Sequence, residues 1–224
     1  MTTNESALAS APRPRMDVAG VAPVLVRNFA PLAGVLVFGW SIGPFLLMSV
    51  FNVAFAIGCI GAVGVTVSQR QMSAAPVRAF GMLADVLRML CTATLAAVLF
   101  SALFGWVVAI LALGENAQVF DRALLWSALA TIASCVPGML ARYRHDVALG
   151  IDEETRKARD QPVVFGLLSS GGFIFILSGY AAQFGNHGLA ALAVLVTALF
   201  TFRDLRPDFM RAAAPRGRTP TRRR

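Results

Sequence analysis

The feature that most constrains this chain is a long stretch without a charged or histidine side chain. It runs from Asn28 to Ser68. One membrane crossing takes about 20 apolar residues, so about 40 residues are enough for two crossings. The segment Gly39–Pro44 interrupts this stretch with two glycines and a proline, which favour a turn over a continued helix. The stretch therefore predicts a hairpin of two membrane helices joined by a short uncharged turn.

The composition of the whole chain agrees with a membrane location. Hydrophobic residues make up 57% of the 224 residues and charged residues only 14%, whereas soluble domains carry about 25% charged residues. Mean hydropathy is +0.66. Only one of the 20 basic residues, Lys157, is lysine, and this arginine preference together with abundant alanine is typical of GC-rich bacterial genomes. We therefore expect a multi-pass protein of the bacterial inner membrane.

Apolar segments recur along the rest of the chain and predict an all-α fold. We expect a polytopic bundle of six transmembrane helices within residues 21–205, preceded by a disordered tail at 1–20 and followed by a basic tail at 206–224. The expected helices are residues 22–40, 45–67, 86–113, 123–141, 163–182 and 189–202. A cleaved signal peptide is not expected, because no A-x-A site follows Phe38. Met16 is an alternative start to Met1.

The distribution of basic residues predicts the orientation. If the six helices alternate, every basic residue except Arg122 falls on one side. Positive charge resists translocation, so that side is expected to be cytoplasmic, with both termini. The three tryptophans, Trp40, Trp106 and Trp126, are expected at the opposite interface, where indole rings prefer to lie.

One connection, residues 141–161, is predicted to be a substantial polar loop. Within it, Asp152 with Arg156 and Glu153 with Lys157 have the i,i+4 spacing that favours a short exposed helix. A second charged pair, Asp85 with Arg88, is expected at the entry of the third helix. The loop and the tail from residue 206 are the expected contact surfaces for partners.

Strongly polar residues within the predicted spans are few. An ionisable side chain in mid-membrane usually indicates function, and the predicted boundaries place none there. The candidate intramembrane polar site is Asn28, Ser49 and Asn52. It has two interpretations, a pathway for a neutral solute or interhelical hydrogen bonds of about 1 kcal/mol each.

Small residues recur at helical spacing in the second and fifth predicted helices. Such residues let helices approach closely in lipid, where apolar burial provides no driving force. The candidate packing residues are Ala54, Gly58, Gly61, Ala62, Gly166, Ser170, Gly171 and Gly172. These faces are expected to meet within the bundle, on a second copy of the chain, or on another membrane protein.

Chemical motifs are not evident. The cysteines lack paired spacing and nearby histidines, so neither a disulfide nor a metal or cofactor site is expected. Ser169 or Ser170 with His187 could suggest an intramembrane serine protease, but the serines and the histidine would lie near opposite membrane faces, beyond the ~3 Å that general-base catalysis requires. We expect no catalytic residues. The cysteines are Cys59, Cys91 and Cys135.

The tail after residue 205 is rich in arginine. Near a membrane it would attract anionic lipid by about 1 kcal/mol per arginine. Nucleic-acid binding is not expected, because no aromatic or folded platform accompanies the charge.

The first hairpin resembles a known family through the pattern Asn28-x-x-Pro31-Leu32-x-Gly34-Val35-Leu36-x-Phe38-Gly39-Trp40. This is similar to an uncharacterised bacterial and archaeal membrane family, the domain of unknown function 6498. Gly171-Gly172 and Arg203-Asp204-Leu205 extend the resemblance to the last hairpin. It implies a helical membrane fold and leaves the chemistry open. Where the family has a tyrosine and a glutamate in the second helix, this chain has Ser49 and Asn52.

The sequence thus favours a non-enzymatic structural or interaction protein of the membrane. The alternative is a small channel or facilitator for a neutral solute, with the polar residues of the second helix in its path.

Overall fold

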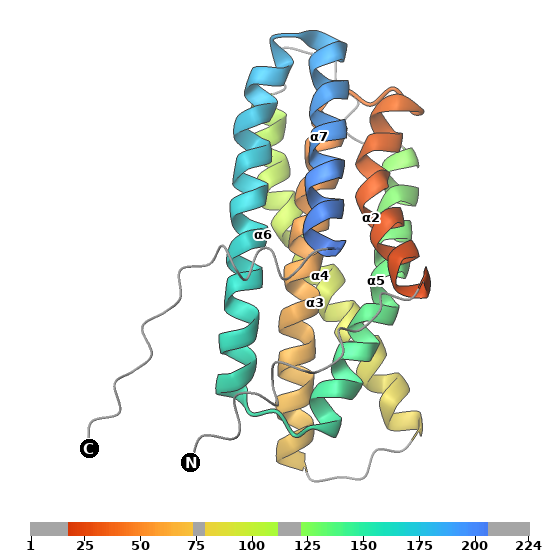
Figure 1. Ribbon diagram of the computed structural model, residues 1–224, viewed down its shortest axis with the longest axis vertical. Helices are drawn as coiled ribbons and strands as arrows, with labels where there is room; N and C mark the ends of the chain where they lie inside the picture. The colour runs from red at the N-terminus through yellow and green to blue at the C-terminus, as the bar shows by residue number, and fades with distance from the viewer. Residues whose placement is uncertain (1–17, 74–78, 112–121, 206–224) are drawn as a thin grey trace, which may run out of the picture.

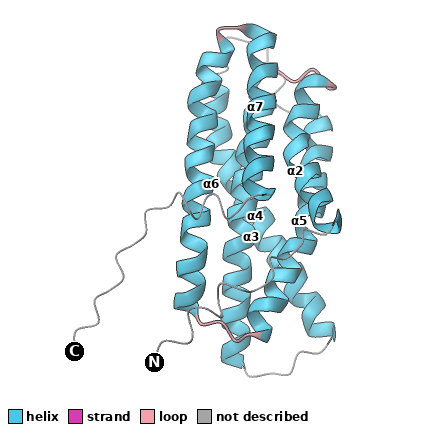
Figure 2. Ribbon diagram, viewed as in Figure 1, coloured by secondary structure: helices cyan, strands magenta, loops and turns pink. Residues whose placement is uncertain are grey.

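The computed structural model describes residues 18–73, 79–111 and 122–205, and these residues form helices joined by short turns (Figure 2). The helices are α2 (Val18–Leu36), α3 (Ile42–Ser73), α4 (Ala79–Leu111), α5 (Arg122–Ala148), α6 (Glu153–Ala182) and α7 (Gly185–Leu205). The all-α prediction is confirmed. Most of the predicted N-terminal tail and the whole basic tail at 206–224 lie outside the described residues.

The helices stand alongside one another as a bundle with two tiers (Figure 1). Helices α2 and α7 have 19 and 21 residues, whereas α3, α4, α5 and α6 have 27 to 33. At 1.5 Å per residue, the shorter two are about 30 Å long, which matches the apolar core of a bilayer. The upper tier thus contains all six helices, and the lower tier contains only the extensions of α3 to α6.

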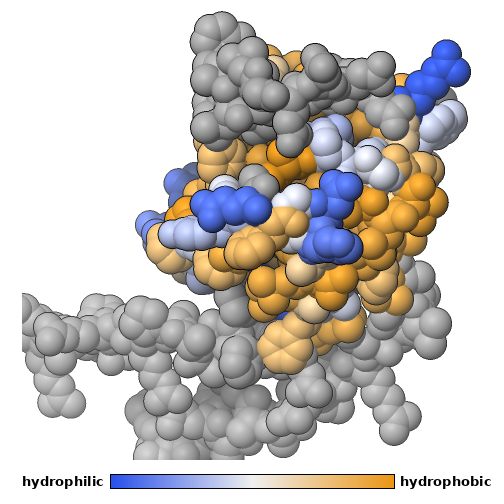
Figure 3. Space-filling model, turned by 90° about the horizontal axis from the view of Figure 1, so that it is seen from above, coloured by the Kyte–Doolittle hydropathy of each residue, from blue (hydrophilic) through white to orange (hydrophobic). Residues whose placement is uncertain are grey.

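Five of these helices, α3 to α7, are long and apolar enough to cross a membrane, and α2 contributes the shorter apolar segment Val24–Leu36. Large apolar side chains are exposed on every helix, for example Leu103 (74% exposed) and Phe165 (72%). Seen down the bundle from above, apolar side chains cover much of the described surface (Figure 3). Apolar exposure on this scale is a feature of proteins surrounded by lipid.

The long polar loop predicted at residues 141–161 is instead mostly helix, and only residues 149–152 form a turn. Helix α6 begins ten residues before the predicted position, because Asp152 caps it by accepting the Thr155 backbone N–H at 3.2 Å. The predicted pair of Glu153 with Lys157 is present at 2.6 Å. The expected partner of Asp152, Arg156, instead donates to Ser68 of α3 at 2.6 Å.

The turn between α2 and α3 begins four residues earlier than predicted and ends three residues earlier. Helix α2 ends at Leu36, and Gly39 follows with a φ of 64°, a conformation that glycine adopts without strain. The Trp40 ring folds back over Gly34, where an added Cβ would lie 2.0 Å from it. The indole is therefore buried, at 5% exposure, and only Trp126 lies exposed; the side chain of Trp106 lies outside the described residues.

Helix α3 is the centre of the packing, because buried residues of both apolar clusters belong to it. One cluster joins α3 to α4 and α5 through side chains such as Phe55, Met89 and Tyr143. The other joins α3 to α6 and α7 through Phe45 and Ile174 among others. A helix buried on both sides positions its polar residues against several neighbours at once.

Candidate functional site

The three predicted polar residues lie where α2, α3, α5 and α7 meet, and all of them are buried. Asn28, Ser49 and Asn52 have 3%, 2% and 6% of their surface exposed. A buried polar group without a hydrogen-bond partner lowers the stability of the fold by about 1–3 kcal/mol. The partners of these three side chains therefore indicate which helices they hold together.

Asn52 compensates for a proline in the neighbouring helix. Pro31 has no N–H, so the Arg27 carbonyl four residues earlier has no donor within α2. Asn52 Nδ2 donates to that carbonyl over a long 3.5 Å, and Thr131 Oγ1 of α5 donates to Asn52 Oδ1 at 3.1 Å. One amide thereby joins α2, α3 and α5.

Asn28 extends these contacts to α7. Its side-chain Nδ2 donates to Asp204 Oδ2 at 3.1 Å, and its backbone carbonyl accepts from Thr197 Oγ1 at 3.2 Å. We call Asn28, Asn52, Thr131, Thr197 and Asp204 the polar belt. Ser49 is not part of it, because its hydroxyl donates to the Phe45 carbonyl of its own helix at 2.8 Å.

An ion pair that the sequence reasoning missed stands beside the belt. Arg27 lies in the middle of α2 and pairs with Asp204, which Arg203 also contacts at 3.0 Å. The predicted helices 22–40 and 189–202 left Arg27 near the start of the first and Asp204 beyond the end of the last. An arginine inside an apolar run and the Arg-Asp pair after the last run were the available signals.

The predicted pair of Asp85 with Arg88 is replaced by a different arrangement in the lower tier. Asp85 accepts hydrogen bonds from Arg70 Nε and from the Tyr143 hydroxyl, both at 2.6 Å. Arg88 donates to Gln69 instead. Asp85 faces α3 and α5, so partners from those helices displace the residue one turn away on its own helix.

A cavity of about 670 Å³ adjoins the belt at Asp204. Residues of α3, α5 and α6 line it, and Arg27 of α2 and the last residues of α7 border it, near the lower end of α7 in Figure 1. Its charged lining residues are Arg27, Arg142, Arg159, Arg203 and Asp204, and its apolar wall includes Ile60, Met139 and Phe165. We call it the arginine cavity.

Aspartates pair with the arginines of this cavity. The pairs are Arg27 and Arg203 with Asp204, Arg142 with Asp160, and Arg159 with both Asp146 and Asp160. Four arginines therefore face three aspartates, and one positive charge remains in excess. Ionisable clusters at membrane depth are costly and are usually functional.

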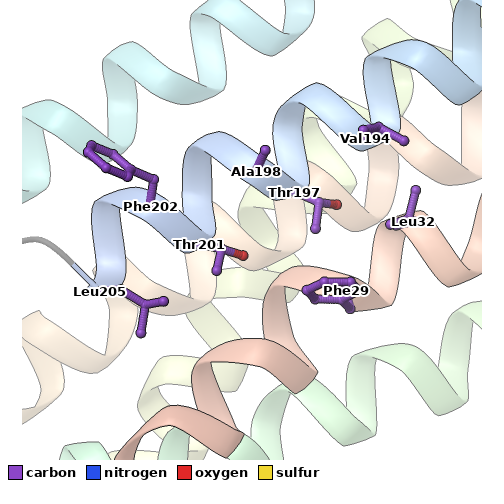
Figure 4. A pocket seen from close by; sticks show the side chains of 8 residues that line it. All are labelled: Phe29, Leu32, Val194, Thr197, Ala198, Thr201, Phe202 and Leu205. Carbon is purple, nitrogen blue, oxygen red and sulfur yellow. The ribbon is translucent and has the colours of Figure 1, made fainter. Parts of the chain in front are cut away.

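A second hollow is an apolar groove of about 530 Å³ between α2 and α7 (Figure 4). Its lining side chains are Phe29, Leu32, Val194, Thr197, Ala198, Thr201, Phe202 and Leu205. Phe29 and Phe202 are about half exposed at its edges. The groove has the character of a lipid-facing surface and presents no charged side chain among its lining residues.

The candidate packing residues occupy different surroundings. On α3, Ala54 and Ala62 are buried in the core, and Gly58 lies so close to α4 that an added Cβ would be 3.0 Å from the Ala93 carbonyl oxygen. Around Gly61 and Gly172, an added Cβ would meet no atom within 4 Å.

On α6, three further packing candidates face the bundle. Gly171 faces Val53 of α3, at 3.7 Å for an added Cβ. Gly166 and Ser170 line the arginine cavity, and Ser170 Oγ donates to the Gly166 carbonyl at 2.7 Å. Among the packing candidates, Gly171 thus contacts α3 directly, whereas Gly166 and Ser170 border the cavity.

No family model, curated protein or solved structure matches this chain. The resemblance of its first hairpin to the family named above stays an expectation. Within the described residues, no group of three His, Cys, Asp or Glu side chains is placed to hold a metal ion.

Proposed function

We propose that this chain is an integral protein of the bacterial inner membrane, with six spans and both termini in the cytoplasm. We further propose that it acts as a non-enzymatic structural or interaction protein. Its partners are the bilayer itself, anionic lipid at the tail 206–224, and a second copy or another membrane protein. The observation that supports the structural role is the polar belt, whose two asparagines bond to neighbouring helices.

The belt supports a packing role over a solute pathway. Asn52 is buried, and both ends of its amide are used, the oxygen by Thr131 and the nitrogen by the Arg27 carbonyl. Ser49 is occupied by its own helix. A pathway for a neutral solute would need polar groups that are free to exchange partners with the solute. Asn28 and Asn52 instead bond to neighbouring helices, and Ser49 bonds within α3.

The placement of charge supports the orientation. In the described residues, the ion pairs lie in the lower tier or next to the last residue of α7, whereas Arg122 begins α5 at the other end. A bundle with its basic residues at one end follows the positive-inside pattern of membrane proteins.

The test is the water accessibility of position 52. We expect Asn52→Cys, in a background with the three native cysteines replaced by alanine, to resist a membrane-impermeant thiol reagent added outside. Gln118→Cys, in the connection between α4 and α5, is the positive control and should react. Reaction at position 52 together with position 118 would replace the packing role with the solute pathway.

A further inference from the structure

The arginine cavity has more cationic hydrogen-bonding capacity than its own aspartates use. Arg142 Nε and Arg203 Nη1 are buried and have no hydrogen-bond partner among the described residues. Both residues line the cavity. The third donor, Arg27 Nη1, contacts only the Cys135 sulfur at 3.9 Å, and sulfur is a weak acceptor.

Unpaired guanidinium nitrogens are costly in a buried setting. Leaving a charged donor unsatisfied costs more than leaving a neutral one, so an acceptor with negative charge would be bound favourably. Phosphate oxygens suit arginine well, because the planar fork of N–H donors matches their geometry. The excess of one positive charge over the three aspartates points to the same ligand class.

The rest of the lining is mainly apolar, so the ligand should also have an apolar part. Ile60 of α3, Met139 of α5 and Phe165 of α6 are apolar residues of the lining, and Phe165 is 72% exposed. The volume of about 670 Å³ falls within the range of small-molecule sites. A ligand with a phosphate head and an apolar body would satisfy both parts of the lining.

We propose that the arginine cavity binds an organic phosphate, with its phosphate group on Arg142 and Arg203 and its apolar part on the wall of α3, α5 and α6. In the orientation proposed above, the cavity lies at the cytoplasmic boundary of the upper tier, at the depth of lipid headgroups. The depth of the cavity in the membrane rests on the proposed topology. The guanidinium donors of the cavity do not depend on that topology. The phosphate belongs either to a lipid headgroup or to a soluble phosphate compound.

The experiment is a calorimetric titration of the purified full-length chain in a non-ionic detergent. Three probes separate the sources: dihexanoyl phosphatidic acid, inorganic phosphate, and dihexanoyl phosphatidylcholine with the same chains and no net charge. We expect phosphatidic acid to bind and phosphatidylcholine not to bind. Additional binding of inorganic phosphate would identify a soluble phosphate as sufficient, and its failure to bind would identify the amphiphile.

The matched variants are Arg142→Gln and Arg144→Gln, which remove the same charge from the same helix. Arg144 is exposed and lies outside the cavity lining. We expect Arg142→Gln to weaken phosphatidic acid binding at least about tenfold and Arg144→Gln to change it less than about twofold. Arg142→Lys keeps the positive charge but lacks the planar guanidinium donors, so it should give an intermediate affinity for phosphatidic acid.

Two results would overturn the proposal. One is the absence of binding by both phosphatidic acid and inorganic phosphate to wild-type protein that is monodisperse and folded. The other is a failure of selectivity, seen either as equal binding of phosphatidic acid and phosphatidylcholine or as equal weakening by Arg142→Gln and Arg144→Gln, because the site would then not recognise the anion. The titration is made in detergent, so its outcome is independent of the number of spans and of the accessibility of position 52.

Discussion

At the scale of single residues, Asn52 and Ser49 form a natural comparison. Both are buried polar residues of α3, one turn apart, but only Asn52 bonds to other helices. We expect Asn52→Ala to lower the free energy of unfolding by about 1 kcal/mol, because the Thr131 hydroxyl and the Arg27 carbonyl lose their partner. Ser49→Ala should have a much smaller effect.

The measurement is thermal or denaturant unfolding of both variants in the same detergent. Equal losses for the two variants would contradict an interhelical role for Asn52. The comparison is informative because the substitutions share depth, helix and final residue, so the difference isolates the bonds to α2 and α5.

At the scale of helices, two glycines of α3 make a similar pair. An added Cβ at Gly58 would lie 3.0 Å from the Ala93 carbonyl of α4, whereas at Gly61 it would meet nothing within 4 Å. We expect Gly58→Val to destabilise the bundle by about 1–3 kcal/mol, because backbone atoms of α4 must move away. Gly61→Val should be close to neutral in the monomer.

Unfolding measurements on the monomer test the difference, and a destabilisation at Gly61 equal to that at Gly58 would contradict it. A second readout is the oligomeric state. A second copy of the chain was one of the alternatives for the small-residue faces. If Gly61 contacts such a copy, Gly61→Val will reduce self-association without unfolding the monomer.

The helices themselves could be predicted from apolar runs, but their ends could not. Apolar content indicates where lipid or core surrounds a helix, and it gives no information once the helix leaves the membrane. The start of α6 depends on the Asp152 cap and on Arg142 and Arg159, which pair across to Asp160 and Asp146. These are tertiary contacts, which a short sequence window does not contain.

The candidate site was predictable to a similar extent. Asn52 stood out as a polar residue in an apolar run, and Pro31 implied a carbonyl without a donor at Arg27. The donor itself, and the pairing of Arg27 with Asp204 across 177 positions, depend on how the helices assemble. The arginine cavity depends on the same assembly, because its arginines come from four helices.

At the scale of the whole molecule, the number of spans depends on α2. Its apolar segment, Val24–Leu36, is shorter than the other spans and has Arg27 near its start, but Asp204 neutralises that charge. A paired arginine close to the start of an apolar segment can extend its side chain to the headgroups. We therefore expect α2 to cross the membrane, which makes the number of spans even and puts both termini in the cytoplasm.

Fusions of alkaline phosphatase, active only outside, and a fluorescent protein that folds inside should report a cytoplasmic location at each terminus. An odd number of spans would put the reporters on opposite sides, and an external N-terminus would show that α2 lies on the membrane surface.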